Sequence, residues 1–285
     1  MTKTTIEWAT DVWNPTTGCT KVSPGCKNCY AERIANRFWG ERKFSDVQCH
    51  PERLDQLRRW RKPRRIFVDS MSDLFHPDVP DDFIWKVFET MILGNRRHTY
   101  MILTKRPARM KAWFDVYQER FWNYHAPNQT PREYVTVPWP DPCIWLGVSV
   151  ENQQAADERI PLLLQTPAAV RFVSVEPMLE KIDLWKFATR EETFGSMYDY
   201  RGEYEFYQVA GFPKGKVKIS EGIDWVICGC ESGSGARPME LDWARSLRDQ
   251  CQDAGVPFFL KQAAINGKLV KMPELDGKVW AEYPL

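Results

Sequence analysis

Short β-branched or aromatic runs alternate along this chain with segments of helical periodicity. Seven runs indicate strands, at residues 6–13, 65–69, 99–104, 144–150, 170–175, 225–228 and 257–261. Apolar stripes at helical spacing lie between several of them, as at Phe83, Val87 and Met91. Such alternation is typical of parallel strands joined by crossover helices. The sequence therefore predicts an α/β fold, a partial or full TIM-like (β/α) barrel of about six to seven parallel strands. A doubly wound open sheet is the alternative.

The chain is long enough for one barrel domain that covers residues 1–285. Two stretches interrupt the alternation of strands and helices. Residues 117–142 are rich in aromatic residues and proline, and residues 189–222 are rich in tyrosine, phenylalanine, glycine and charge. Both are long for ordinary connections, so we expect them to be insertions or lids.

The amino terminus has no apolar segment of the kind that signal peptides carry. No uninterrupted apolar stretch reaches the roughly 20 residues that a membrane-spanning helix needs. Eight cysteines in a chain of this size, without an export signal, suit a reducing compartment better than a disulfide scaffold. We therefore expect a cytoplasmic protein that has no membrane partner.

Three of the cysteines, Cys19, Cys26 and Cys29, lie within eleven residues. Two glycines and a proline in the same segment permit the tight turns of a metal-binding loop. A closed zinc site normally has four ligands, and no fourth cysteine or histidine lies nearby in the sequence. Three thiolates would leave one metal position open for a substrate or cofactor.

The other cysteines are scattered, and we expect most of them to be small buried hydrophobic residues. They are Cys49, Cys143, Cys228, Cys230 and Cys251. Cys228 and Cys230 flank Gly229, and they are a lesser candidate for a fourth ligand or for another metal.

Polar side chains follow nearly every predicted strand, where parallel α/β proteins gather their functional groups. The residues at these positions are 69–73, Thr104, Lys105, Arg106, Ser149, Glu151, Asn152, Ser174, Glu176, Glu231, Lys261 and Gln262. Some of them are expected to cap helices. The three glutamates could share one cavity and do acid–base chemistry. They could equally hold a cationic cofactor, or pair with Lys105, Arg106 or Lys261.

Two further features have a structural and a functional interpretation. Seven basic residues lie between Arg53 and Arg65 against a single acid, Asp55. Such a run is usually a solvated surface, and contact with phosphate groups is the alternative. The loop at 229–235 is rich in glycine and serine, and it could cradle an anion or be an ordinary turn.

The run Asn14-Pro15-x-x-Gly18-Cys19 … Gly25-Cys26-x-x-Cys29-Tyr30-Ala31 resembles the cluster loop of radical S-adenosylmethionine enzymes. It looks closest to the branch that contains spore photoproduct lyase. The whole chain resembles a phage- and prophage-associated three-cysteine family of that superfamily, on the phrases at 173–179, 231–233 and 258–262. The gap of six residues between the first two cysteines is longer than the three that the superfamily usually has.

The resemblance implies a [4Fe-4S] cluster on Cys19, Cys26 and Cys29, with S-adenosyl-L-methionine bound at the fourth iron. It also implies cofactor contacts from eight residues: Tyr30 near the adenine, Asp69, Ser70, Ser72 and Asp73 near the methionine moiety, and Ser149, Glu151 and Glu176 near the ribose and carboxylate. The catalytic residues stay unknown.

The function that follows is a radical enzyme, of lyase or transferase type, that generates a 5′-deoxyadenosyl radical. Nucleic acid is the preferred substrate, for repair or base modification, because aromatic side chains can stack on bases. A flavodoxin- or ferredoxin-like reductant is the expected partner. The first alternative is a non-enzymatic iron–sulfur or zinc protein that binds nucleic acid. The second is a barrel hydrolase that uses Glu151, Glu176 or Glu231.

Overall fold

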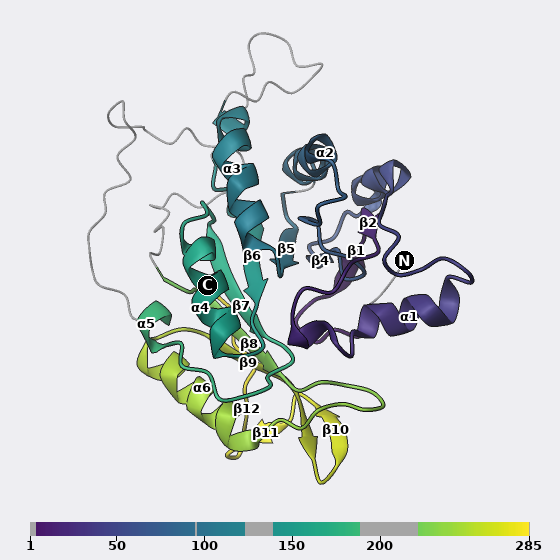
Figure 1. The fold of residues 1–285 in the computed structure, drawn as a ribbon. Helices are drawn as coiled ribbons and strands as arrows, with labels where there is room; N and C mark the ends of the chain where they lie inside the picture. Colours follow the sequence, from purple (N-terminus) through teal and green to yellow (C-terminus); the bar gives the residue numbers. More distant parts are fainter. Residues whose placement is uncertain (1–3, 95, 123–138, 189–221, 285) are drawn as a thin grey trace, which may run out of the picture.

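The computed structural model describes residues 4–94, 96–122, 139–188 and 222–284. Its centre is one curled sheet of eight strands, in the order β1-β4-β5-β6-β7-β8-β9-β10 (Figure 1). These strands are β1 (Asp11–Trp13), β4 (Arg65–Val68), β5 (Thr99–Thr104), β6 (Ile144–Ser149), β7 (Val170–Val175), β8 (Trp225–Gly229), β9 (Phe258–Ile265) and β10 (Lys268–Lys271). Neighbouring strands from β1 to β9 pair in parallel, and β10 is antiparallel to β9.

The strand order follows the chain without a reversal. This order excludes the doubly wound alternative, because that fold changes its winding direction at a switch point. Within the described residues, β1 and β10 are the two edges of the sheet, which is therefore a half-barrel. The predicted α/β fold with parallel strands is confirmed at this level, and β5 has the predicted bounds.

The helices accompany the sheet, and most of them follow a strand. In the described residues they are α1 (Tyr30–Phe38), α2 (Asp81–Ile92), α3 (Pro107–Trp122), α4 (Gln153–Leu164), α5 (Trp185–Ala188) and α6 (Leu241–Asp253), with the 3-10 turns η1 (Pro24–Cys26) and η2 (Pro51–Arg59). Two small strand pairs join β2 (Thr16–Thr17) to β3 (Gln48–Cys49) and β11 (Glu274–Leu275) to β12 (Lys278–Val279). The predicted stripe of Phe83, Val87 and Met91 is buried on α2.

Two apolar clusters lie on opposite faces of the sheet. The outer cluster joins alternate strand residues such as Ile66 and Val68 to α2, α3, α4 and α6. The inner cluster consists of Trp8, Ala9, Phe67, Met101, Phe172, Trp225, Ile227 and Phe259. Side chains alternate along a strand. Polar residues that follow a member of this inner cluster by two positions, such as Ser174 after Phe172 and Lys261 after Phe259, therefore also face the inside of the half-barrel. The aromatic inner cluster therefore lies below the carboxyl ends of the strands, where polar side chains gather. This polar end is the mouth of the half-barrel.

The first strand is shorter than predicted. It was expected over residues 6–13, but β1 begins at Asp11. Trp8 is only 1% exposed and belongs to the inner cluster, where its ring lies 4.8 Å from the ring of Phe67. The segment before β1 thus fills the half-barrel instead of extending the sheet.

The two predicted insertions fall mainly outside the described residues, which omit 123–138 and 189–221. At the start of the first one, residues 117–122 belong to helix α3, and at its end Trp139 is buried against Phe121. No helix in the described ranges has the length and apolar character to cross a membrane.

Replacing Gly147 with alanine is expected to destabilise the protein by about 1–3 kcal/mol. Gly147 pairs with Phe172 of the next strand, and a Cβ atom at this glycine would lie 2.6 Å from the Phe172 ring. The ring is fully buried, so it has little room to move. Urea unfolding would measure the loss, and the double variant Gly147→Ala/Phe172→Leu is expected to recover part of it. A single variant as stable as the wild type would contradict this packing.

Candidate functional site

The three clustered cysteines lie in one loop, residues 18–29, between β2 and α1. Cys26 ends the η1 turn, and Cys29 is the residue before α1. All three thiols are free, and all three residues are half-buried. The start of the loop is fixed by backbone hydrogen bonds, since Gly18 N donates to Met71 O at 3.0 Å and Cys19 N donates to Phe44 O at 2.8 Å. The loop is therefore held near the carboxyl end of β4.

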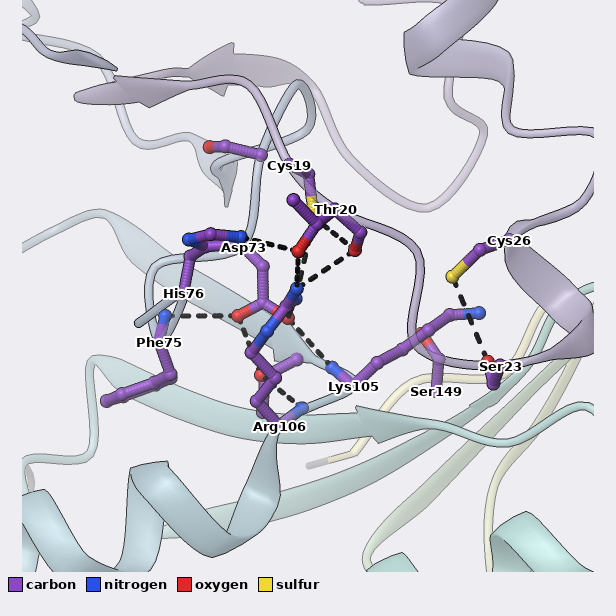
Figure 2. A network of polar contacts seen from close by, with 12 residues as sticks. Cys19, Thr20, Ser23, Cys26, Asp73, Phe75, His76, Lys105, Arg106 and Ser149 are labelled. Carbon is purple, nitrogen blue, oxygen red and sulfur yellow. Dashed lines mark hydrogen bonds and ion pairs between the residues drawn. The ribbon is translucent and has the colours of Figure 1, made fainter. Parts of the chain in front are cut away.

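A buried ion pair between Asp73, which follows β4, and Arg106, which follows β5, holds the loop in place beside Cys19 (Figure 2). Arg106 Nη1 lies 3.0 Å from Asp73 Oδ2 and 3.4 Å from Cys19 Sγ, and Nη2 donates to Thr20 O at 2.9 Å. Asp73 also accepts hydrogen bonds from Thr104 Oγ1 at 2.7 Å and from the backbone N–H groups of Phe75 and Lys105. Asp73 thus orients Arg106, and Arg106 holds the loop.

Glu151 fastens the loop at a second point. It is fully buried, its Oε2 lies 2.9 Å from Arg159 Nη1 and 3.6 Å from Lys105 Nζ, and its Oε1 accepts from Gly25 N at 3.2 Å. A Cβ atom at Gly25 would lie 2.9 Å from Lys105 Nζ and 3.0 Å from the Glu151 carboxyl carbon, so a larger residue does not fit without a shift. Burial would raise the pKa of Glu151, but Lys105 and, less strongly, Ser23 and Arg159 hold the pKa below its ordinary value.

Glu231, in the loop after β8, binds the cysteine loop at a third point, near Asn28. It accepts a hydrogen bond from Asn28 Nδ2 at 2.8 Å, and Arg237 Nη2 lies 2.6 Å from its Oε1. Burial opposes ionisation, but Arg237 and Asn28 lower the pKa of Glu231 to about 2. Arg33 of α1 donates to Ser232 O at 2.5 Å. The glycine-rich loop 229–235 therefore binds the cysteine loop and α1, which favours the structural interpretation of that loop.

Tyr30 and Glu176 lie at the mouth of the half-barrel. The hydroxyl of Tyr30 donates to Ser70 O at 2.5 Å, while 41% of this residue is exposed. Glu176 Oε1 lies 3.1 Å from Lys261 Nζ, and Glu176 Oε2 accepts from Ser174 Oγ at 3.3 Å. Each of the three glutamates therefore pairs with at least one cation. The sequence left this pairing open beside acid–base chemistry, and the geometry favours the pairing.

The segment after β4 mostly binds the chain itself. Asp69 Oδ1 accepts from Thr16 N at 2.9 Å, and Ser70 Oγ donates to the Asn14 side chain at 3.1 Å. Ser72 Oγ donates to Thr16 O at 3.0 Å. These contacts hold residues 14–17, which lead into the cysteine loop. Ser149 is buried, and its carbonyl accepts from Arg159 Nη1 at 2.7 Å.

The environments of Cys19 and Cys26 differ. Burial and the charge of Asp73 raise the pKa of the Cys19 thiol to about 11, against the opposing effect of Arg106. Burial would also raise the pKa of Cys26, but the Lys105 ammonium and backbone hydrogen bonds hold that pKa below its ordinary value. Figure 2 shows the Lys105 side chain reaching toward the Cys26 side of the loop.

The three thiols of the loop are donors of the kind that bind an iron–sulfur cluster. Across the described parts of the chain, no three His, Cys, Asp or Glu side chains converge closely enough to hold one metal ion. A four-iron cluster is wider than an ion, so its ligand sulfurs stand further apart. The three thiols are free, share one loop, and have Lys105 and Arg106 beside them to balance the negative charge of thiolates.

Cys228 and Cys230 are buried, as is Cys251, whereas Cys49 and Cys143 are half-buried. Cys228 belongs to the outer cluster, and burial raises its pKa well above the ordinary value. Its Sγ lies 3.7 Å from the sulfur of Met178. The position of Cys228 favours burial over a role as a fourth ligand.

Several arginines of the basic stretch between Arg53 and Arg65 form hydrogen bonds or ion pairs within the protein. Arg53 Nη1 donates to Asn14 O at 3.0 Å, and Arg58 lies 3.3 Å from Asp55. Arg64 pairs with Asp11, and Arg65 donates to the hydroxyl of Tyr283 at 3.3 Å. Arg64 and Arg65 also stand at the amino end of β4, away from the cysteine loop. The stretch therefore gives little support to phosphate binding at the mouth.

Arg106 is the principal residue whose role sequence reasoning missed. The run Thr104-Lys105-Arg106 was placed at a strand end, and a glutamate was suggested as a partner of Arg106, whereas the structure pairs Arg106 with Asp73. No role was assigned to Asn28, Arg33 or Arg159, although Asn28 lies between two of the cysteines. The signal that could have found Asn28 is its place inside the loop, because a side chain there must bind the loop or its neighbours.

The fold and the site define an α/β half-barrel protein with a three-cysteine loop at the mouth of its sheet. Residues 3–284 match the family described as "Protein of unknown function (DUF5131)", and the chain belongs to that family. No curated protein and no solved structure matches the chain.

Proposed function

We propose that this protein is a radical S-adenosylmethionine enzyme that holds a [4Fe-4S] cluster on Cys19, Cys26 and Cys29. The observation that carries the proposal is the loop of three free thiols fastened at the carboxyl end of a parallel half-barrel. Cysteine thiolates are the usual ligands of iron–sulfur clusters. Barrel enzymes bind their cofactors and substrates at the carboxyl ends of the strands.

When bound, the cluster would supply a low-potential electron for the cleavage of S-adenosyl-L-methionine. The chain itself holds the ligand loop through Arg106, Glu151 and Glu231. Glu176 and Lys261 present a carboxylate and an ammonium group at the mouth. Such a pair suits the charged amino-acid end of S-adenosyl-L-methionine. The aromatic inner cluster closes the floor below them and excludes water.

Nucleic acid is the substrate class that we propose, with repair or base modification as the reaction. The resemblance to a DNA-repair lyase supports it, and so does the exposed side of α1, the helix that follows the loop. Tyr30, Ile34 and Phe38 recur there at helical spacing with exposures of 41%, 41% and 69%. Arg37 lies 5.2 Å from the Phe38 ring. Aromatic and cationic groups together suit the stacking of unpaired bases. A flavodoxin- or ferredoxin-like reductant in the cytoplasm would deliver the electron.

Alanine at Cys19, Cys26 or Cys29 is expected to abolish cluster assembly, because a cubane with two protein ligands is not held. Anaerobic reconstitution of the wild type is expected to give roughly four irons and four sulfides per chain, and the variants almost none. Cys49→Ala and Cys143→Ala are matched controls, since these thiols are free and half-buried but lie outside the loop. Both controls are expected to load normally.

The second measurement is 5′-deoxyadenosine formed after reduction in the presence of S-adenosyl-L-methionine. A loaded wild type that never forms it would support the non-enzymatic iron–sulfur alternative, and a wild type that takes up zinc instead of iron and sulfide would support the zinc protein. Activity on a substrate that survives Cys19→Ala would support the hydrolase alternative. Each of these results would overturn the proposal.

A further inference from the structure

Arg106 donates a hydrogen bond to the sulfur of Cys19, with 3.4 Å between Nη1 and Sγ (Figure 2). The guanidinium is fixed independently of that sulfur by three oxygen atoms. Asp73 Oδ2 lies 3.0 Å from Nη1, and Thr20 O and Thr20 Oγ1 lie 2.9 Å and 3.0 Å from Nη2. The side chain of Arg106 is only 9% exposed. Its contact with Cys19 is therefore built into the fold.

Two charged groups of opposite sign, Arg106 and Asp73, act on Cys19. A guanidinium stays protonated at every pH at which proteins fold, so Arg106 is a permanent cationic donor at this sulfur. Asp73 pairs with the same Nη1 that contacts the sulfur, and its charge also acts on Cys19. Without Arg106, the sulfur would be left with the negative charge of Asp73. At Cys26 the side-chain hydrogen bond is to the neutral hydroxyl of Ser23, with 3.8 Å between Oγ and Sγ, and the nearby cation Lys105 acts electrostatically on the thiol.

We propose that Arg106 is a positioning residue that raises the reduction potential of the cluster through the sulfur of Cys19, an inference that rests on the proposed function. Hydrogen bonds to sulfur and the net charge nearby are among the terms that set the potential of an iron–sulfur cluster. Reduction adds negative charge to the cluster, so a cationic donor at a ligand sulfur stabilises the reduced form more than the oxidised form. Loss of Arg106 removes this donor and exposes the charge of Asp73, and both changes lower the potential.

The test is an anaerobic potentiometric titration of the reconstituted protein, followed by the EPR signal of the reduced cluster. Arg106→Met keeps the length of the side chain but loses its charge and its donors. It is expected to lower the equilibrium constant for reduction about tenfold, which is about 59 mV for one electron. Arg106→Lys keeps the charge and is expected to shift the potential less. Arg109→Met is the matched control, because Arg109 lies three residues further along, in the first turn of α3, and contacts Val79 O and Asp81 instead of the loop.

The outcomes separate the two proposals. A wild type that assembles no four-iron cluster would overturn the proposed function and this inference together. A cluster whose potential is unchanged or higher in Arg106→Met would overturn the inference alone, as would an equal shift in Arg109→Met. If Arg106→Met does not retain iron, the neutral variant Arg106→Gln replaces it. A lower potential in that variant supports the inference, and an unchanged or higher one overturns it.

Discussion

Replacing Asp73 with alanine is expected to lower the free energy of unfolding of the metal-free protein by about 3–5 kcal/mol, because it removes one partner of a buried ion pair. The carboxylate accepts from Thr104 Oγ1, from two backbone N–H groups and from Arg106 Nη1, all within 3.1 Å. Without it, the Arg106 charge and the Thr104 hydroxyl lose a partner where water has little access. Urea unfolding followed by circular dichroism would measure the change.

Asp115→Ala is the matched control for this prediction. Asp115 also pairs with a cation, Lys111 at 2.6 Å, but the pair is exposed and joins residues one turn apart on α3. Pairs of this kind contribute little, so the control is expected to change stability by less than about 0.5 kcal/mol. A similarly small effect for Asp73→Ala would mean that the buried pair does not stabilise the region that carries the cysteine loop.

The strands could be predicted because each buried strand carries its own local signal. Residues 99–104 form a short apolar run between charged neighbours, and β5 has these bounds. The first strand was predicted too long for a related reason. Trp8 is as apolar as a strand residue, and the sequence alone cannot distinguish a strand from an extended segment that fills the half-barrel.

The site could be predicted only in part. Parallel strands end at one edge, so polar residues after successive strands were expected to gather there, and Asp73, Glu151 and Glu176 do lie near the loop or the mouth. Their partners could not be predicted, because the partners are distant in the sequence. Arg106 is 33 residues from Asp73, and Gly25 is 126 residues from Glu151. Only the fold brings these groups together.

Asp73 is expected to stabilise the protein, whereas Asp69, four residues before it, is expected to destabilise the protein at neutral pH because it is buried. Asp69 is 2% exposed, and within the described residues its Oδ2 has no hydrogen-bond partner. Burial raises its pKa from 3.8 to about 7. Between these two values the unfolded chain has released the proton that the folded chain still holds. The contribution of Asp69 to the free energy of unfolding therefore falls as pH rises through this range, by about 1.4 kcal/mol per pH unit, and this contribution is constant above the range.

The variant Asp69→Asn removes this titration, and the amide can still accept the hydrogen bond from Thr16 N. Its stability relative to the wild type is expected to increase by about 3 kcal/mol between pH 5 and pH 8, as measured by urea unfolding at both values. Asp276→Asn is the control, because both aspartates have a positive φ, 61° and 56°, that asparagine tolerates. Arg248 and Arg245 lower the pKa of Asp276, so this carboxyl is ionised in both the folded and the unfolded chain at pH 5 and pH 8. The difference in stability between Asp276→Asn and the wild type is therefore expected to be the same at both pH values. A constant difference for Asp69→Asn as well would mean that the carboxyl is already ionised in the folded protein at pH 5, and that burial at the end of β4 does not keep it neutral.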